Sequence, residues 1–385
     1  MNKRIVLICF IATLLIYGAQ GSYTPYLSSY YQLNGISKLH IGLMSSIGPI
    51  VAITIQPLWG YLSDKTGKRK SILQVLSLAT AMVMLLYFLD SRPIILVVAS
   101  FLYSSFAMAI IPLANAVITK ASNKYNFDYA RVRIGGPIGH SMMPLLVSYL
   151  LSIYNKAMFV VAIILYLVLF IVISIMPDEM FEYETNKQSN TKGKIFDNYE
   201  IYYLFALCVL NTFGNSVLWT YIGPKVVDMG YSQSIIGILT FVLSLGELPV
   251  LMLIRRVTKN FQTINIMNFA VTISAIRLLL ASSNSIVLIF ICQFIEGLTY
   301  MVAFYTAVTY ITKHCKPEKV SSAQTILVTL ESGVGAVLAN LLGAYIINNL
   351  GINISFRIIS LAIIMTMLLI NLLLRIRNRK EGSYE

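Results

Sequence analysis

Four ionisable side chains stand near the middle of long apolar segments: Glu247, Arg277, Glu296 and Glu331. Ionisable groups at such positions are costly to bury, and they usually face a charged partner or a water-filled cavity. If all four were ionised, three negative charges would face one positive charge. Burial and mutual repulsion then favour a protonated carboxyl group near neutral pH, which is the minimum chemistry for proton coupling. The alternative interpretation is a buried ion-pair network that only locks the packing of the segments.

The composition shows what kind of element must hold these four groups. The 385 residues are 57% hydrophobic and 12% charged, against roughly 45–50% and about 25% in soluble domains. This excludes a soluble globular enzyme, a disordered chain and a disulfide scaffold. A bilayer-spanning helix needs about 20 mostly apolar residues. We count twelve such segments, at 5–31, 41–62, 71–89, 93–119, 134–153, 157–176, 201–223, 233–254, 262–281, 286–312, 320–347 and 355–376.

Basic residues indicate the orientation of these spans. Lys3 and Arg4 precede an apolar run that continues to Leu33, which favours an uncleaved first helix over a signal peptide. Of the 29 Lys and Arg residues, all but six fall in segments on the side of the N-terminus. Arg277 lies inside a span, and the others fall on the opposite side: Lys38, Arg92, Lys156, Lys225 and Arg357. This asymmetry predicts cytoplasmic termini, so the net charge of +13 reports topology and not a nucleic-acid partner.

The expected fold class is an all-α membrane protein with twelve transmembrane helices in two six-helix bundles. We predict an N-terminal bundle at 1–176, a polar cytoplasmic linker at 177–200 and a C-terminal bundle at 201–385. The chain has no Gly-rich phosphate loop followed by Lys-Ser/Thr, which argues against ATP-driven transport. The scattered histidines and cysteines (Cys9, Cys208, Cys292, Cys315) offer no ligand spacing, so we expect no metal and no cofactor.

The loop after the second span carries the string GYLSDKTGKRK at 60–70. It resembles the signature loop of the major facilitator superfamily, between the second and third helices of that fold. Gly60 would let two helices approach closely, and Gly67 would turn the chain tightly. The resemblance implies that Gly60, Asp64, Gly67 and Arg69 form a conformational latch, with Asp64 near the positive end of a neighbouring helix. The alternative is a plain basic loop on the cytoplasmic side.

A second string, NFDYARVRIGGPIG at 126–139, opens the fifth span. It is similar to a string of the lactose permease, nucleoside–proton symporter and phenylpropionate permease group. With PLANA at 112–116, it is most similar to the phenylpropionate permease branch. The resemblance implies that Arg133 binds substrate. The carboxylate that assists this arginine in lactose permease maps to Asn115, and this departure puts galactoside recognition in question. An arginine at the membrane interface is the alternative role for Arg131 and for Arg133.

The intramembrane charges also match this group. The residue pairs Gly246-Glu247 and Ile276-Arg277 resemble the Gly-Glu and Ile/Val-Arg pairs of helices 8 and 9 in lactose permease. The string QFIEGLTY at 293–300 resembles one in the phenylpropionate permease branch. Where those relatives carry histidine this chain has Glu296, and where lactose permease has its essential glutamate it has Thr299. The resemblance therefore implies that the proton carrier has moved to Glu296, with Glu247 as the other candidate and Glu331 the least supported.

Polar stripes follow spans 1, 4, 7 and 10, which line the central cavity in the resembled family. Polar faces on apolar spans are expected to meet protein or water rather than lipid. We predict that the substrate-binding residues are Gln20, Asn115, Arg133, Asn211, Asn215, Trp219 and Tyr300. Hydrogen bonding between helices, without a substrate, is the alternative role of each.

The predicted function is proton-coupled uptake of a small polar or weakly acidic organic solute by alternating access in the cell membrane. The first alternative is a proton-antiport efflux pump for amphipathic compounds. An alternative of another class is a membrane sensor that binds a ligand without moving it. We expect no enzyme activity. The expected partners are a small-molecule substrate, H+ and the lipid bilayer, with no nucleic acid, and we expect a monomer.

Overall fold

A computed structural model describes residues 2–181, 196, 199–315 and 319–381, and all regular structure in these ranges is helical. Twelve helical segments are long and apolar enough to cross a membrane. They are Lys3–Leu33, Lys38–Thr66, Arg69–Leu89, Pro93–Lys124, Tyr129–Leu151, Ala157–Ile175, Glu200–Asp228, Ser234–Asn260, Thr263–Ala281, Ile286–His314, Ser322–Leu350 and Ile352–Arg377. Each overlaps one predicted span, so the all-α fold with twelve spans is confirmed.

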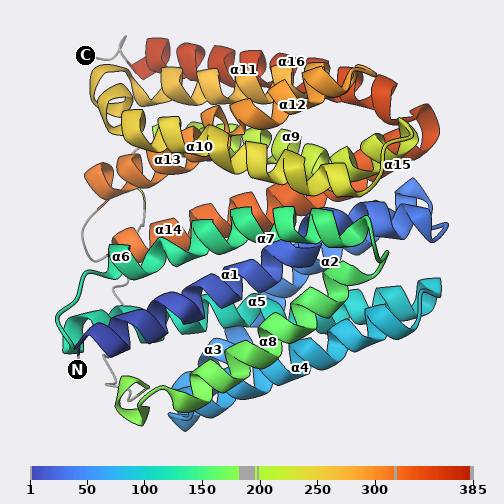
Figure 1. The fold of residues 1–385 in the computed structure, drawn as a ribbon. Coiled ribbons are helices and arrows are strands. Elements are labelled where there is room, and N and C mark those ends of the chain that lie inside the picture. Colours follow the sequence, from blue (N-terminus) through green and yellow to red (C-terminus); the bar gives the residue numbers. More distant parts are fainter. Residues whose placement is uncertain (1, 182–195, 197–198, 316–318, 382–385) are drawn as a thin grey trace. The chain divides into compact units, whose positions relative to one another are not determined.

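The chain groups into two compact units, which are described separately. Unit 1 comprises Met1–Ile36, Ile47–Lys187 and Val226–Phe241. Its helix α1 packs against α7 and α8, while α4 packs against α5 and α8 (Figure 1). The helices that contribute to it are α1 (Asn2–Leu33), part of α2 (Lys38–Thr54), α3 (Gln56–Thr66), α4 (Arg69–Leu89), α5 (Pro93–Lys124), α6 (Tyr129–Arg133), α7 (Gly135–Leu151), α8 (Ala157–Ile175), η1 (Asp178–Met180) and the start of α10.

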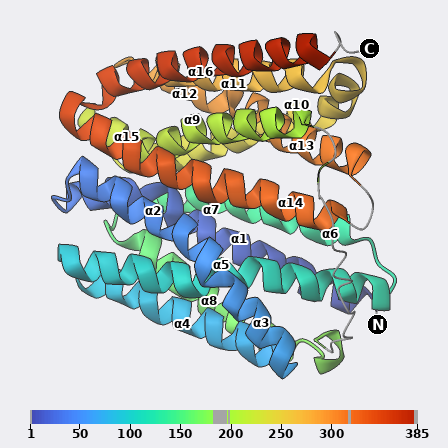
Figure 2. The same ribbon diagram turned by 180° about the vertical axis from the view of Figure 1, so that it is seen from behind.

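Unit 2 comprises Ser37–Ser46, Gln188–Lys225 and Val242–Glu385. Within it α11 packs against α12, α13 and α16 (Figure 2). Its helices are the start of α2, most of α9 (Glu200–Asp228), the larger part of α10 (Ser234–Asn260), α11 (Thr263–Ala281), α12 (Ile286–Phe294), η2 (Ile295–Leu298), α13 (Tyr300–His314), α14 (Val320–Val328), η4 (Thr329–Gly335), α15 (Ala336–Leu350) and α16 (Ile352–Glu381). The predicted bundle boundaries stay a prediction, and most of the predicted linker lies outside the described residues.

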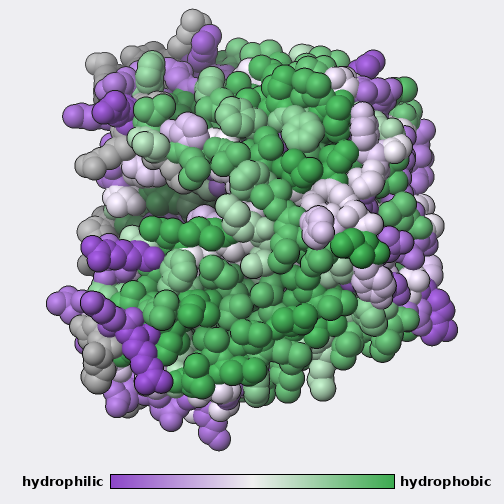
Figure 3. Space-filling model, in the orientation of Figure 1, coloured by the Kyte–Doolittle hydropathy of each residue, from purple (hydrophilic) through white to green (hydrophobic). Residues whose placement is uncertain are grey.

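Hydrophobic side chains cover the middle of the helices, and hydrophilic side chains gather at the helix ends (Figure 3). Large apolar residues such as Met252, Leu89 and Met365 are 82%, 72% and 69% exposed. Exposure on this scale is unusual for a water-soluble monomer, but it is what a lipid-facing surface requires. The pattern therefore supports the interpretation of the apolar segments as membrane spans.

Three spans that the sequence predicts as continuous are interrupted. In the second span Ile55 separates α2 from α3. In the tenth span the 3-10 helix η2 separates α12 from α13, and in the eleventh span the π-helix η4 separates α14 from α15. Helix irregularities of these kinds are frequent at functional sites because they redirect side chains and free backbone groups. Glu296 lies in η2 and Glu331 lies in η4, so both glutamates occupy irregular turns.

Candidate functional site

Arg277 is the centre of a buried polar cluster in unit 2. Its side chain projects from α11, and only 2% of its surface is exposed. Nε donates to the Cys292 carbonyl at 2.9 Å, and Nη2 donates to Gln293 Oε1 at 3.3 Å. Nη1 donates to Asn215 Oδ1 and, at 3.0 Å, to Thr299 Oγ1. The guanidinium group is thus fixed by neutral acceptors, and its charge forms no ion pair with the described carboxylates.

The two candidate proton carriers lie beside each other. Glu247 on α10 and Glu296 on η2 are close enough for a hydrogen bond between their carboxyl groups when one of them holds a proton, and both feel the charge of Arg277. Glu296 Oε2 is buried and has no hydrogen-bond partner in the described part of the chain. Two adjacent carboxylates repel each other, so one proton shared by the pair relieves the repulsion.

Two glycines bring these glutamates together. A Cβ atom on Gly246 would lie 1.7 Å from the carbonyl oxygen of Phe294, and one on Gly297 would lie 2.8 Å from the Cα atom of Glu247. No side chain fits in these spaces, so α10 and the α12–η2 segment touch through their backbones. The crossing places Glu247, next to Gly246, against Glu296, next to Gly297.

Thr299 connects the break in the tenth span to the cluster. Its hydroxyl group donates to the Glu296 carbonyl at 2.7 Å, and it lies 3.1 Å from Asn215 Oδ1. The side chain has no exposed surface. This threonine thus connects the backbone turn of η2 to α9 and α11.

Glu331 does not join this cluster. It is 8% exposed on η4, and its carboxyl group lies within hydrogen-bonding reach of the Cys208 thiol on α9. Of the four predicted proton-coupling residues, the structure brings together Glu247, Arg277 and Glu296 and places Glu331 at a separate buried position.

Unit 1 also holds an arginine that is partly buried, Arg133. Its guanidinium group lies 4.4 Å from the ring centroid of Tyr17 on α1, a cation–π contact. A Cβ atom on Gly136 would lie 2.3 Å from Arg133 Nη1, so this glycine makes room for the guanidinium group. No described carboxylate pairs with Arg133. Its charge is held by an aromatic face and remains available to an anionic or hydroxyl-rich ligand.

The other predicted binding residues divide between the units. Gln20 and Asn115 are half-buried on α1 and α5 in unit 1. On α9, Asn215 contacts Arg277, Asn211 is 2% exposed and Trp219 is 42% exposed. Tyr300, on α13, is 47% exposed and stacks on Phe304. Asn215 is therefore the predicted binding residue that the structure joins to the charged cluster.

Sequence reasoning did not select Gln293 and Thr299 as site residues, although both hold Arg277. Gln293 lies on the predicted stripe of the tenth span, three residues before Glu296, and this spacing was the available signal. The signal for Thr299 was the resemblance, which placed it where lactose permease has its essential glutamate, but a buried threonine usually bonds to the carbonyl group of its own helix and was not selected. The contact between Thr299 and Arg277 depends on the turn at η2.

The predicted latch is built only in part as expected. Gly67 ends α3 in the left-handed conformation with φ of 66°, and Arg69, in the first turn of α4, donates to Asp64 at 2.7 Å. The expected close helix contact at Gly60 is wrong for this structure. A Cβ atom there would meet nothing within 4 Å among the described residues, because α3 leaves that face of the helix open.

We expect Gly67→Ala to lower the midpoint of thermal unfolding, because alanine in the left-handed region costs about 1 kcal/mol. Gly60→Ala is the matched control, since that glycine is helical and its Cβ position is open; this substitution is expected to leave the midpoint unchanged or slightly raised. Equal midpoints for the two variants in detergent would contradict the assigned conformation of Gly67.

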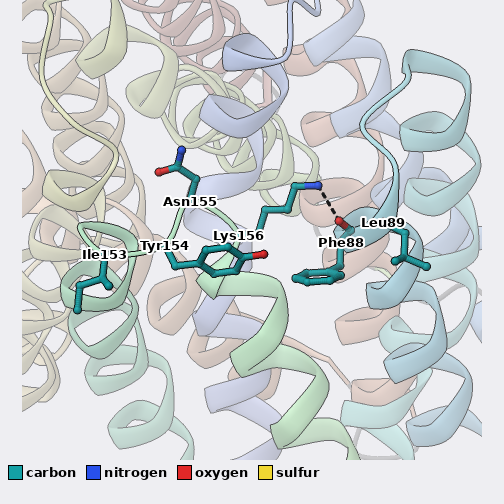
Figure 4. A pocket seen from close by; sticks show the side chains of 6 residues that line it. All are labelled: Phe88, Leu89, Ile153, Tyr154, Asn155 and Lys156. Atoms are coloured by element: carbon teal, nitrogen blue, oxygen red, sulfur yellow. Dashed lines mark hydrogen bonds between the residues drawn. The ribbon is translucent and has the colours of Figure 1, made fainter.

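A pocket of about 500 Å³ lies between the end of α4 and the loop that joins α7 to α8 in unit 1. Lys156 closes one side of it by donating to the Phe88 carbonyl at 2.6 Å (Figure 4). It is lined by Phe88, Leu89, Ile153, Tyr154, Asn155 and Lys156. None of these is a predicted site residue. The lysine satisfies a carbonyl group at the end of α4, which is an ordinary capping role.

Comparison with known proteins identifies the family. The model of the MFS_1 like family, a branch of the major facilitator superfamily, matches residues 8–358. The chain belongs to this family. It is therefore a multi-pass transporter of the major facilitator type and not an enzyme. The resemblance inferred from the loop at 60–70 and the string at 126–139 is confirmed at this level.

Relatives in this superfamily cover most of the chain. An uncharacterized transporter of Bacillus subtilis, YwbF, is 26% identical over 347 residues, which is 86% of this chain and 84% of the relative. The maltose permease of Geobacillus stearothermophilus is 26% identical over 386 residues, with coverage of 96% and 94%. The crystal structure of the nucleoside transporter NupG shares the fold at a TM-score of 0.81 and 16% identity, with coverage of 95% and 98%.

Proposed function

We propose that this transporter couples the uptake of a small polar or weakly acidic organic solute to the movement of protons. The observation that carries the proposal is the Glu247–Glu296 pair beside Arg277, in which Glu296 Oε2 is buried and accepts no hydrogen bond from the described residues. Such a pair binds one proton strongly while it is closed to water. It releases the proton when a conformational change brings the guanidinium group or water to the carboxylates.

The fixed position of Arg277 supports this role. Its neutral partners hold the guanidinium group close to both carboxyl groups without a direct ion pair. Protonation of the pair and formation of an ion pair with Arg277 are therefore competing states. A transporter that alternates between them binds a proton in one state and loses it in the other.

Arg133 supports the solute class. Its guanidinium group, held on Tyr17 and without a described carboxylate partner, suits a carboxylate or a group of hydroxyls. The maltose permease and the nucleoside transporter among the similar proteins are named for small polar solutes. The distribution of basic residues further supports cytoplasmic termini and a cell-membrane location.

The test uses the purified protein in proteoliposomes with labelled maltose, uridine or benzoate as probes. The probe is the one that raises the unfolding midpoint of the protein, because a ligand that binds the folded state stabilises it. A pH gradient, acidic on the side opposite the termini, is expected to drive accumulation of the probe on the side of the termini. Expulsion under the same gradient would indicate antiport, and binding without flux would indicate a sensor; either result contradicts coupled uptake.

We expect Arg133→Gln to weaken probe binding by about tenfold to a hundredfold, since a charged hydrogen bond to a ligand is worth about 1.5–3 kcal/mol. Arg131→Gln is the matched control, because Arg131 is exposed and lies near Asp128. Titration of the probe by calorimetry measures both affinities. Equal affinities of the two variants would remove Arg133 from the proposed binding site.

A further inference from the structure

In unit 2, the region between α9 and α13 that extends from Thr299 and Asn215 to Tyr310 and Glu200 is called the seam below. Hydrogen-bonding groups join its two sides at both ends: the Thr299 hydroxyl lies 3.1 Å from Asn215 Oδ1, and Tyr310 donates to Glu200 at 3.1 Å. Residue numbers rise from Thr299 to Tyr310 on one side of the seam and fall from Asn215 to Glu200 on the other. The two helices are therefore antiparallel neighbours along this stretch.

Between these points the seam holds two buried polar atoms without a partner. Asn211 Oδ1 and Thr306 Oγ1 have no hydrogen bond to any described residue, and the two side chains are 2% and 3% exposed. Leaving one such atom unsatisfied costs about 1–3 kcal/mol. Buried polar groups of this kind are usually satisfied by internal water. Two of them in one seam indicate a place for ordered water.

Glu331 lies next to the same seam. Its carboxyl group reaches Cys208, which shares a face of α9 with Asn211 and Asn215 because the three are spaced by three and four residues. The rise from Cys208 to Asn215 is about 10 Å. That is too long for a direct hydrogen bond or for one bridging water, so the connection needs a short file of about three waters, for which Asn211 Oδ1 and Thr306 Oγ1 supply the polar anchors. The far end of the seam holds Glu200, Tyr310 and the stacked ring of His314.

We propose that this seam is the proton exit of the transporter, with Glu331 as a relay between the Glu247–Glu296 pair and the end of unit 2 at Glu200. In the transfer, one O–H bond breaks at the Glu296 carboxyl group and one forms at the Glu331 carboxylate. Each water of the file along the seam gains one proton and gives up another, so nothing is oxidised or reduced. The inference rests on the proposed proton coupling, and it assigns to the π-helix η4 the role of presenting Glu331 to the seam.

The test follows the carboxyl C=O stretching band of the protonated pair by infrared spectroscopy during transfer of reconstituted protein from H2O to D2O. Glu296→Gln identifies the band by removing it. Asn211→Leu and Glu331→Gln are each expected to keep the band and to slow its deuterium shift by about tenfold or more, the effect of about 1.4 kcal/mol on a barrier. Asn371→Leu, which removes a half-buried amide that pairs with Asn268, is the control and is expected to exchange like the wild type.

Three results would overturn the relay. Wild-type exchange in both Asn211→Leu and Glu331→Gln would show that the proton leaves by another route, while pH-driven uptake would still stand. Slowing in Glu331→Gln alone would separate Glu331 from the seam. The absence of a band sensitive to Glu296→Gln or Glu247→Gln would contradict the protonated pair itself, and with it the proposed function.

Discussion

Replacing Gly246 by valine is expected to abolish pH-driven accumulation of the probe and to destabilise the protein by about 3 kcal/mol or more. A Cβ atom at this position would lie 1.7 Å from the Phe294 carbonyl oxygen. The two helices must move apart by more than an ångström to admit it. Glu247 and Glu296 are then no longer close enough to share a proton, so both the coupling and the local packing are lost.

Gly48→Ala is the control for the Gly246 substitution. A Cβ atom on Gly48 would meet Met108 Cε at 3.5 Å, which is an ordinary contact. This variant is expected to unfold at the wild-type temperature and to accumulate the probe normally. Near-normal accumulation by the Gly246 variant would show that close contact between α10 and the α12–η2 segment is unnecessary for coupling.

Replacing Arg277 by glutamine is expected to reduce gradient-driven flux by about a hundredfold or more, which corresponds to roughly 2.7 kcal/mol of lost stabilisation. The substitution removes the positive charge near both carboxyl groups. It also leaves the acceptors on Asn215, Gln293 and Cys292 with fewer donors. Breaking a buried charged network costs about 3–5 kcal/mol, so a lower unfolding midpoint is expected as well.

Lys225 provides a control that separates stability from coupling. This lysine is 2% exposed in the same unit and donates to Asn284 at 2.7 Å and to Asn353. Lys225→Met is expected to lower the unfolding midpoint to a similar extent while the protein that remains folded keeps gradient-driven flux. Equal loss of flux per folded molecule in the two variants would mean that Arg277 acts only through stability.

The twelve spans were predictable because hydropathy over about 20 residues is a strong signal that side-chain contacts barely alter. The breaks in the tenth and eleventh spans were not predictable in the same way. Residues 286–312 and 320–347 are mostly apolar along their whole length, and a change from α to 3-10 or π hydrogen bonding leaves the composition of a segment unchanged. The irregular turns at Glu296 and Glu331 therefore required the structure.

The candidate site was predictable in its members but not in its contacts. The positions of Glu247, Arg277 and Glu296 near the middle of apolar spans were enough to select them, because a charged side chain at that depth in the membrane is costly and usually functional. The expectation that carboxylates face Arg277 did not specify that its direct partners are neutral groups such as Asn215 and Thr299. It also grouped Glu331 with the others, although Glu331 contacts Cys208 on α9, seven residues before the Asn215 that contacts Arg277. Contacts between spans depend on helix crossings, which a single sequence does not record.

The most direct test of the central claim compares two transport modes of Glu296→Gln in proteoliposomes. Counterflow exchanges labelled for unlabelled probe and needs no net proton movement, whereas accumulation under a pH gradient does. If Glu296 shares the coupling proton with Glu247, the variant will retain counterflow at a rate within a few-fold of wild type and lose accumulation. Accumulation at the wild-type level in both Glu296→Gln and Glu247→Gln would contradict the claim that this pair carries the proton.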